Sequence, residues 1–325
     1  MSDMTYRALG TSGLRVSVVG IGCNNFGGRM SVEAVGEVVS AALDCGINLF
    51  DTAGAYAGSE DRLGAALGSR RSEAVIATKF PSPYERSQQA GGSRHHIIAA
   101  CEGSLRRLNT DYIDLYQMHM PDPTTPIEET LSALDDLVRV GKVRYIGNSN
   151  FSGWQIADAD WTARTGGYAR MVSAQNNYSL VNREAERDVT PACERFGLGI
   201  LPFFPLASGL LTGKYRRGHP GPDGARLSPG APMAATASRF LNDANFDVLE
   251  ALEKIASDSG VSVLHLAMGG LAAQPAVASV IAGATRAEQV AANADAGAWV
   301  PSAEILDAIN DAAPGPKGAN AARRR

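Results

Sequence analysis

The chain has 325 residues, of which 45% are hydrophobic and 20% charged, and its formal net charge is −4. This is an ordinary composition for a soluble globular protein, and the length allows two domains or one large α/β barrel. No apolar run approaches the ~18 residues of a membrane span. Apart from the terminal ARRR, nothing is basic enough for a nucleic-acid surface, so neither a membrane nor a nucleic acid is an expected partner.

The compartment is predicted from the N-terminus and the cysteines. The residues MSDMTYRALG lack the charged-then-apolar layout of a secretory signal. Cys23, Cys45, Cys101 and Cys193 fall in separate segments without a C-x-x-C pair. In a chain of this length they are typical of free thiols in a reducing compartment. We therefore expect a cytoplasmic protein with no zinc site and no disulfide framework.

Apolar, β-branched segments alternate with helical patterns along the chain. The predicted strands are residues 15–22, 47–50, 74–78, 112–118, 143–147, 171–175, 198–204 and 277–283. Most of their residues are apolar, without a polar face at every second position, as expected for a parallel sheet that is covered on both faces. Helices are predicted between them, for example over 31–46 with Ser31 at its start and over 125–141 with Gly141 at its end. Eight such units favour a closed (β/α)₈ TIM barrel over an open sheet.

Three segments do not belong to a minimal barrel. Residues 5–14 are predicted to form a small N-terminal hairpin or plug before the first strand. Residues 212–240, rich in Gly, Pro and Arg, follow the seventh strand and are too long for a loop without a role, so they are predicted to form a lid. We expect one barrel domain over 1–313 and, from its composition, a disordered tail over 314–325.

Four polar residues stand at or just beyond the ends of successive predicted strands: Asp51, Tyr56, Lys79 and His119. Taken alone, each has an ordinary structural interpretation, such as a helix cap, a surface charge or a core histidine. The carboxyl ends of barrel strands converge on one face, however, so the four side chains are expected to meet there. A carboxylate, a phenol, an ammonium and an imidazole brought together can deliver a proton to a carbonyl oxygen.

Two short stretches look like nucleotide-binding motifs. VVGIGCNNFG places Gly20 and Gly22 after a strand, and Asp51 ends the next strand, as in a dinucleotide-binding sheet. Asn25 stands where the third glycine belongs, however, and Asp51 comes later than the ~20 residues expected, which weakens this interpretation. GLLTGKY is one residue too short for a phosphate loop and has Tyr215 where Ser or Thr would bind magnesium, so a nucleotide-triphosphate role is excluded.

Five stretches, in the same order, resemble sequence blocks of the aldo-keto reductase family. They are INLFDTAGAYAGSEDRLGAAL, DYIDLYQMHMPDPTTPIEETLSALDDLVRVGKVRYIGNSNFSGWQ, AQNNYSLVNREAE, LPFFPLASGLLTGKY and VIAGATRAEQVAAN. The resemblance runs from about Tyr6 to about Asn293. It implies a (β/α)₈ barrel, in agreement with the strand count, and an NADP-dependent oxidoreductase that reduces the carbonyl group of a small-molecule aldehyde or ketone to an alcohol.

The resemblance also implies roles for the four strand-end residues. Tyr56 matches the family's proton donor, Lys79 and Asp51 the pair that tunes it, and His119 the histidine beside the substrate carbonyl. A free phenol has a pKa near ~10, so a neighbouring cation is needed to favour its anion. The substrate pocket is expected to contain Asn24, Asn25, Tyr56 and His119.

An NADPH site is implied as well. Ser149, Asn150 and Gln175 match residues that hydrogen-bond the nicotinamide carboxamide, and Phe203 matches the aromatic ring that stacks on the nicotinamide. Arg286, with Thr285, lies where a helix start would favour the extra phosphate of NADPH over NADH. The other expected cofactor contacts are Gly22, Cys23, Asp51, Pro205, Leu206, Ser208, Gly209, Leu211, Lys214, Gly283, Gln289 and Asn293.

Two alternative functions remain open at this point. One is a sugar or glycoside dehydrogenase, or an isomerase, on the same scaffold. The other is a cofactor-sensing binding protein that resembles the β subunits of potassium channels. The sequence names neither the substrate nor the oligomeric state.

Overall fold

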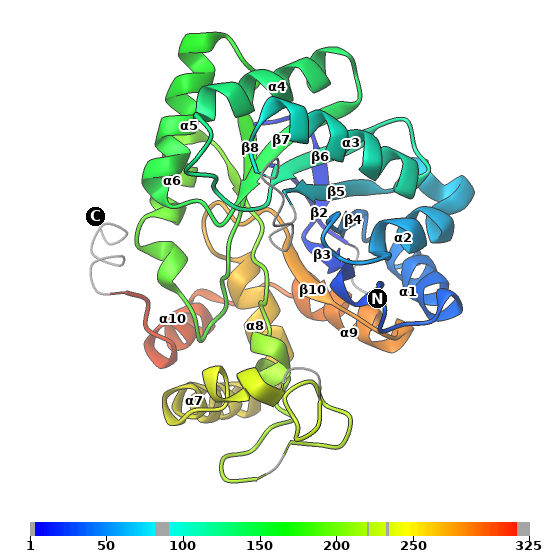
Figure 1. Cartoon of the computed structure of the whole chain (residues 1–325). Coiled ribbons are helices and arrows are strands. Elements are labelled where there is room, and N and C mark those ends of the chain that lie inside the picture. The colour runs from blue at the N-terminus through cyan, green and yellow to red at the C-terminus, as the bar shows by residue number, and fades with distance from the viewer. Residues whose placement is uncertain (1–3, 82–90, 220, 232–233, 317–325) are drawn as a thin grey trace.

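Eight parallel strands form the central sheet of the protein (Figure 1), in a computed structural model that describes residues 4–81, 91–219, 221–231 and 234–316. Neighbouring strands follow the order β10-β3-β4-β5-β6-β7-β8-β9. Their bounds are β3 (Val19–Gly22), β4 (Leu49–Asp51), β5 (Val75–Phe80), β6 (Ile113–Met118), β7 (Val143–Ser149), β8 (Met171–Gln175), β9 (Gly199–Ile200) and β10 (Val280–Gly283).

Hydrogen bonds close this sheet on itself. The amide of Ile200 in β9 donates to the carbonyl of Ala276 at 2.6 Å, and the amide of Ala278 donates to the carbonyl of Ile200 at 2.9 Å. A parallel bridge joins Ile200 to Val277, just before β10. The predicted (β/α)₈ barrel is confirmed, and the carboxyl ends of all eight strands therefore open on the same face.

Helices connect the strands and surround the sheet (Figure 1). They are α1 (Val32–Asp44), α2 (Ser59–Leu67), α3 (Arg94–Leu108), α4 (Ile127–Arg139), α5 (Gly153–Gly166), α6 (Val189–Phe196), α7 (Asp243–Ser259), α8 (Val263–Ala272), α9 (Ala287–Ala298) and α10 (Ala303–Ala312). Local sequence explains their ends. The hydroxyl of Ser31 caps α1 by accepting from the Ala34 amide, and Gly46 follows the helix at φ +78. None of the described helices is long and apolar enough to cross a membrane.

The amino-terminal hairpin closes the bottom of the barrel. Strands β1 (Tyr6–Ala8) and β2 (Arg15–Ser17) pair antiparallel. Leu9 and Val16 are fully buried in the cluster that fills the barrel interior. The predicted plug is therefore present, but the prediction of one strand over 15–22 was wrong. Residues 15–17 belong to the hairpin and 19–22 to the barrel, a division that a continuous apolar run does not reveal.

The seventh barrel strand is shorter than predicted. Of residues 198–204, only Gly199 and Ile200 form β9, and a single bridge from Asn177 to Phe203 follows. Phe204 adopts φ +53, which ends the extended conformation. The long connection then leads to α7. Most of the predicted tail, residues 317–325, lies outside the described residues.

Candidate active site

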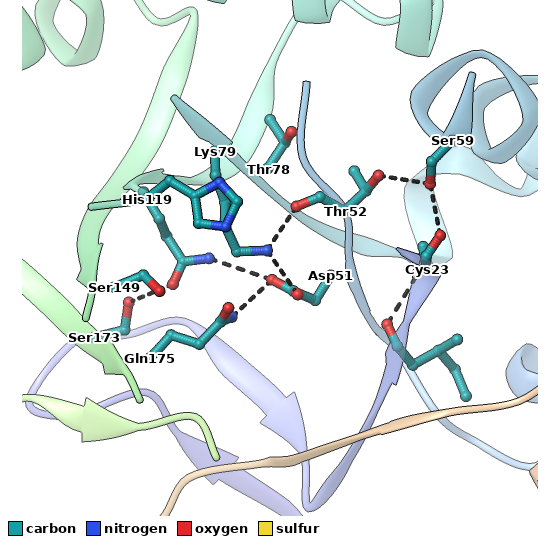
Figure 2. Close-up of polar contacts among 12 residues, drawn as sticks. Cys23, Asp51, Thr52, Ser59, Thr78, Lys79, His119, Ser149, Ser173 and Gln175 are labelled. Atoms are coloured by element: carbon teal, nitrogen blue, oxygen red, sulfur yellow. Dashed lines mark hydrogen bonds and ion pairs between the residues drawn. The ribbon is translucent and has the colours of Figure 1, made fainter. Parts of the chain in front are cut away.

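A buried ion pair lies at the carboxyl ends of β4 and β5 (Figure 2). Nζ of Lys79 is 2.7 Å from Oδ2 of Asp51 and donates to the main-chain oxygen of Thr52 at 2.8 Å. Its side chain is 0% exposed and that of Asp51 is 6% exposed. Oδ1 of Asp51 accepts from Nε2 of Gln175 at 2.8 Å and from Nε2 of Gln117 at 3.4 Å. The carboxylate is therefore held from three strands besides its own.

The lysine remains charged in this setting. Burial by itself would lower the pKa of Lys79, because desolvation disfavours the ammonium form. The charges of Asp51 and Tyr56, and the hydrogen bond to Asp51, outweigh burial and raise its pKa. A permanent cation thus lies next to the phenol of Tyr56.

Tyr56 lies in the loop between β4 and α2. Nζ of Lys79 is 5.1 Å from the centre of its ring, and the ring meets that of His119 edge-on at 5.9 Å between centres. Burial raises the pKa of the Tyr56 phenol, the charge of Lys79 opposes this, and the charge of Asp51 adds to it. Because its pKa lies above the ordinary value, the phenol keeps its proton at neutral pH.

The imidazole of His119 is neutral. Burial, together with the charge of Lys79, lowers the pKa of His119 to about 3. Its Nδ1 is buried without a hydrogen-bond partner among the described residues. The main chain of His119 is fixed by its amide, which donates to the Phe80 carbonyl, and by its carbonyl, which accepts from Asn150. A neutral imidazole with one N–H can donate a hydrogen bond to a carbonyl oxygen.

Hydroxyl groups tie the Tyr56 loop to the loop that follows β3. The hydroxyls of Thr52 and Ser59 are 2.9 Å apart, and Ser59 donates to the Cys23 carbonyl at 2.8 Å (Figure 2). A Cβ on Gly27 would collide with the Ala57 carbonyl oxygen, so the two loops pack too closely for any other residue. These contacts anchor the two loops to each other on this side of the site.

A cavity of about 820 Å³ opens beside these residues. Its wall contains every cofactor and pocket residue predicted from the sequence except Leu211, which is fully buried elsewhere. Asp51, Tyr56 and His119 border it, while Lys79 lies behind them. The wall also contains residues that the sequence did not single out: Arg29, Phe204, Thr212, Gly224, Ala225, Arg226, Ala231, Leu264, Ile281, Ala282, Ala284 and Ala292. Five of them, Thr212, Gly224, Ala225, Arg226 and Ala231, belong to the segment predicted as a lid over the pocket.

The most informative of the missed residues is Arg226, from the segment predicted as a lid. Its Nη2 donates to Oδ1 of Asn25 at 2.9 Å, and Arg29 reaches the same oxygen at 3.5 Å. Arg216 and Arg217 of the same segment instead form ion pairs with acidic residues of α7. No local pattern separates these two kinds of arginine, because their partners are distant in sequence.

Three basic side chains on the cavity wall face no carboxylate partner in the described part of the chain. Among the described residues, Lys214, Arg226 and Arg286 form no ion pair, and Asp51 is the only acidic residue in the wall. Burial lowers the pKa of Lys214, and so do the charges of Arg226 and Arg286. Burial and the charge of Arg29 lower the pKa of Arg226. Uncompensated cations in a cavity favour an anionic ligand.

The chain from 204 to 209 also fits an anion. Phe204, Ala207 and Ser208 have φ of +53, +47 and +57, and Gly209 has +101. Successive turns of this kind can form a concavity of amide groups. The hydroxyl of Ser208 is buried without a hydrogen-bond partner in the described part of the chain, although it lines the cavity. A ligand oxygen at this point would satisfy it.

The other end of the cavity meets the start of α9. Arg286 is the N-cap residue and is exposed. The amide and hydroxyl of Thr285 both donate to Oε1 of Gln289, at 2.8 and 3.2 Å. Cys23, which also lines the cavity, is buried, and burial raises the pKa of its thiol well above the ordinary value. It is therefore not poised to act as a thiolate.

Comparison with known proteins agrees with this architecture. A model of the Aldo/keto reductase family matches residues 18–313. A probable voltage-gated potassium channel subunit beta from Oryza sativa subsp. japonica is 37% identical, over 94% of this chain and 95% of its own length. The uncharacterized oxidoreductase YrpG of Bacillus subtilis is 36% identical, over 97% and 98%. L-glyceraldehyde 3-phosphate reductase of Escherichia coli K12 is 33% identical, over 90% and 88%. The chain belongs to the aldo/keto reductase family of oxidoreductases.

Proposed function

We propose that the chain reduces the carbonyl group of an aldehyde or ketone to an alcohol, with hydride from NADPH and a proton from Tyr56. The observation that carries the proposal is the buried Asp51–Lys79 pair against the Tyr56 ring, with neutral His119 edge-on to it at the cavity wall. These groups supply a proton donor, a charge that stabilises its anion and a neutral donor for the carbonyl oxygen.

Each residue has a separate task in this chemistry. Burial keeps the phenol of Tyr56 protonated until the substrate oxygen gains negative charge, and the ammonium of Lys79 then stabilises the phenolate that remains. Asp51 keeps Lys79 charged and in place. His119 donates to the carbonyl oxygen and fixes its direction. In the oxidative direction the Tyr56 phenolate takes the proton of the alcohol. NADPH, when bound, supplies the hydride.

The residues of the cavity wall fit a dinucleotide. Ser149, Asn150 and Gln175 would hold the nicotinamide carboxamide, and Phe203 would stack on the ring. The hydroxyl of Ser208, which has no partner in the described residues, and the ammonium of Lys214 suit the pyrophosphate. The aromatic ring of Phe203 at the cavity wall offers the stacking surface.

Preference for NADPH over NADH rests on the far end of the cavity. The two cofactors differ by one phosphate on the adenosine ribose. Arg286 stands at the N-cap of α9, where the free amide groups of the first turn also attract an anion. Its charge lowers the pKa of Lys214, and both residues line the same cavity.

A second candidate function follows from the rice relative, whose name is that of a channel subunit. In that case the protein binds the same cofactor but turns over slowly, and the site senses the redox state of the cofactor. A third candidate is a sugar or glycoside dehydrogenase, or an isomerase, on the same scaffold. It would use Asp51, Tyr56, Lys79 and His119 in the oxidative direction.

A panel of carbonyl compounds, followed by loss of NADPH absorbance, tests the proposal. Glyceraldehyde 3-phosphate belongs in the panel because of the E. coli relative. We expect turnover with at least one aldehyde, and a rate lower by ~10²–10⁴ with Tyr56→Phe at equal cofactor saturation. Tight NADPH binding without turnover on any compound would favour the sensing function. Equal rates for the parent and Tyr56→Phe would refute the role of Tyr56.

A further inference from the structure

The carboxylate of Glu60 is buried, and the chemistry proposed above does not use it. Glu60 lies in the first turn of α2 and is 1% exposed. It accepts a hydrogen bond from the hydroxyl of Thr78 at 2.5 Å and from Nε of Arg107 at 2.7 Å. These partners belong to β5 and α3, so one carboxylate joins three elements. A buried carboxylate is costly unless such partners compensate it, which suggests a specific task.

Two of these residues, Thr78 and Glu60, lie close in sequence to the catalytic pair Lys79 and Tyr56. Thr78 immediately precedes Lys79 on β5, and their side chains leave opposite faces of the strand (Figure 2). Glu60 therefore holds β5 from the face behind Lys79. Glu60 also follows Tyr56 by four residues, at the point where the loop enters α2. The segment that carries Tyr56 is thus held at both ends. At one end Asp51 forms an ion pair with Lys79, and at the other Glu60 accepts a hydrogen bond from Thr78.

A cavity of about 330 Å³ borders Gly54 of the Tyr56 loop, together with Lys79 and Arg107. A Cβ on Gly54 would lie 3.3 Å from Nη2 of Arg107, 3.7 Å from the main-chain oxygen of Lys79 and 3.8 Å from Oε2 of Glu60, so the Glu60–Arg107 pair lies directly against the loop backbone. The amide of Gly54 reaches the Lys79 carbonyl only at 3.4 Å. The loop has room to shift backward if the ion pair is lost.

We propose that Glu60, held by Thr78 and Arg107, is a positioning residue that fixes the distance between Tyr56 and Lys79. The inference rests on the proposed carbonyl reduction. Without the Glu60 carboxylate, the Tyr56 loop relaxes toward the cavity and the phenol moves away from the ammonium. The transition state then loses proton transfer and charge stabilisation together, because both depend on that separation.

The test compares Glu60→Gln with Asp160→Asn. Asp160 is also a buried carboxylate with arginine partners, Arg164 at 2.8 Å and Arg170, whose Nε donates at 2.7 Å. Arg170 directly precedes β8, so this pair lies at the amino ends of the strands, away from the catalytic face. Both substitutions replace a carboxylate with an amide of the same shape. They match in chemistry and differ in location.

Unfolding in urea, NADPH affinity, kcat, KM and the pH profile of alcohol oxidation are measured for both variants and the parent. We expect both variants to lose stability. Only Glu60→Gln should lower kcat, by roughly ten- to a hundredfold, with KM and NADPH affinity nearly unchanged. Its kinetic pKa for alcohol oxidation should rise, because the phenolate is farther from Lys79. Equal kcat and pH profiles in Glu60→Gln and Asp160→Asn would overturn the inference.

Arg107 provides a second route if Glu60→Gln does not fold. Its side chain is 40% exposed, so its replacement is less disruptive. We expect Arg107→Met to lower kcat and raise the same kinetic pKa, and Arg107→Lys to recover most of both. A parent enzyme without turnover on any carbonyl would refute the proposed function and this inference with it. An active parent with normal Arg107 variants would refute the inference alone.

Discussion

Replacing Lys79 with methionine, alone and together with Asp51→Asn, distinguishes the contribution of the ion pair to stability from its contribution to catalysis. In Lys79→Met the apolar side chain fills similar space, but the carboxylate of Asp51 loses the partner that lies at 2.7 Å. It keeps only the amide donors of Gln175 and Gln117. A buried charge without its counterion is the costly case, because neither water nor a cation then stabilises it.

The expected magnitude follows from burial. Both side chains are almost inaccessible, so little solvent screening weakens their interaction. Breaking a buried pair by removing one partner typically costs about 3–5 kcal/mol, whereas replacing both partners is close to neutral. Lys79→Met should therefore be destabilised by about 3–5 kcal/mol, and Asp51→Asn in the same chain should restore most of that loss.

Equilibrium unfolding in urea measures both effects, and carbonyl reduction is assayed on the same preparations. We expect the double variant to recover stability but not activity, since the Tyr56 phenolate still lacks its cation. A single variant within about 1 kcal/mol of the parent would show that the pair is not a buried ion pair. A double variant as unstable as the single one would refute the argument that the orphaned carboxylate causes the loss.

The pH dependence has a definite sign. The pKa of Lys79 is raised above its ordinary 10.5 in the folded protein, where burial is outweighed by Asp51 and Tyr56. The resulting stabilisation is complete below pH 10.5 and is lost as the pH rises through the folded pKa. The parent should therefore lose stability on this account only above pH 10.5, and Lys79→Met should lack that loss.

Three further predictions concern single residues. Tyr56→Phe should lower carbonyl reduction by ~10²–10⁴ while NADPH affinity, measured by fluorescence, is retained; turnover within a few-fold of the parent would contradict its role. Because burial and Lys79 lower the pKa of His119 to about 3, its imidazole should stay neutral in an NMR titration from pH 8 to 5. The unfolded chain gains that proton near the ordinary 6.5, so this group should also make stability fall as the pH drops below 6.5, and an imidazole titrating near 6.5 in the folded protein would exclude both expectations. Arg286→Ala should weaken NADPH by roughly tenfold and NADH hardly at all in calorimetric titrations, since a hydrogen bond to a charged group contributes ~1.5–3 kcal/mol; equal weakening of both cofactors would show that Arg286 does not bind the extra phosphate.

The role of the Tyr56 loop links these predictions. Lys79 and Asp51 fix one end of the loop, and Glu60 fixes the other. Substitutions at either end should lower stability and change the chemistry. Substitution of Glu60 leaves both the Tyr56 phenol and the Lys79 ammonium in place, so a higher kinetic pKa in that variant reports a change in the distance between them.

Local sequence patterns determined much of the architecture. Apolar segments of strand length, Ser31 at a helix start and glycine at helix ends depend on neighbours within a few residues, and so they were readable in advance. The count of eight strand–helix units then implied a barrel, and a barrel places strand ends on one face. Asp51, Tyr56, Lys79 and His119 could be selected for that reason, because a strand end is itself a local property.

Tertiary structure decided what depends on residues far apart in the chain. The break after Ser17 and the short β9 follow from how the hairpin and the closing strand meet the barrel, which an apolar run does not encode. Arg226 lies 201 residues from its partner Asn25, and Glu60 joins Thr78 and Arg107 across three elements. The spacing of residues in the sequence does not predict such contacts, because they form only once closure of the sheet has brought the segments together.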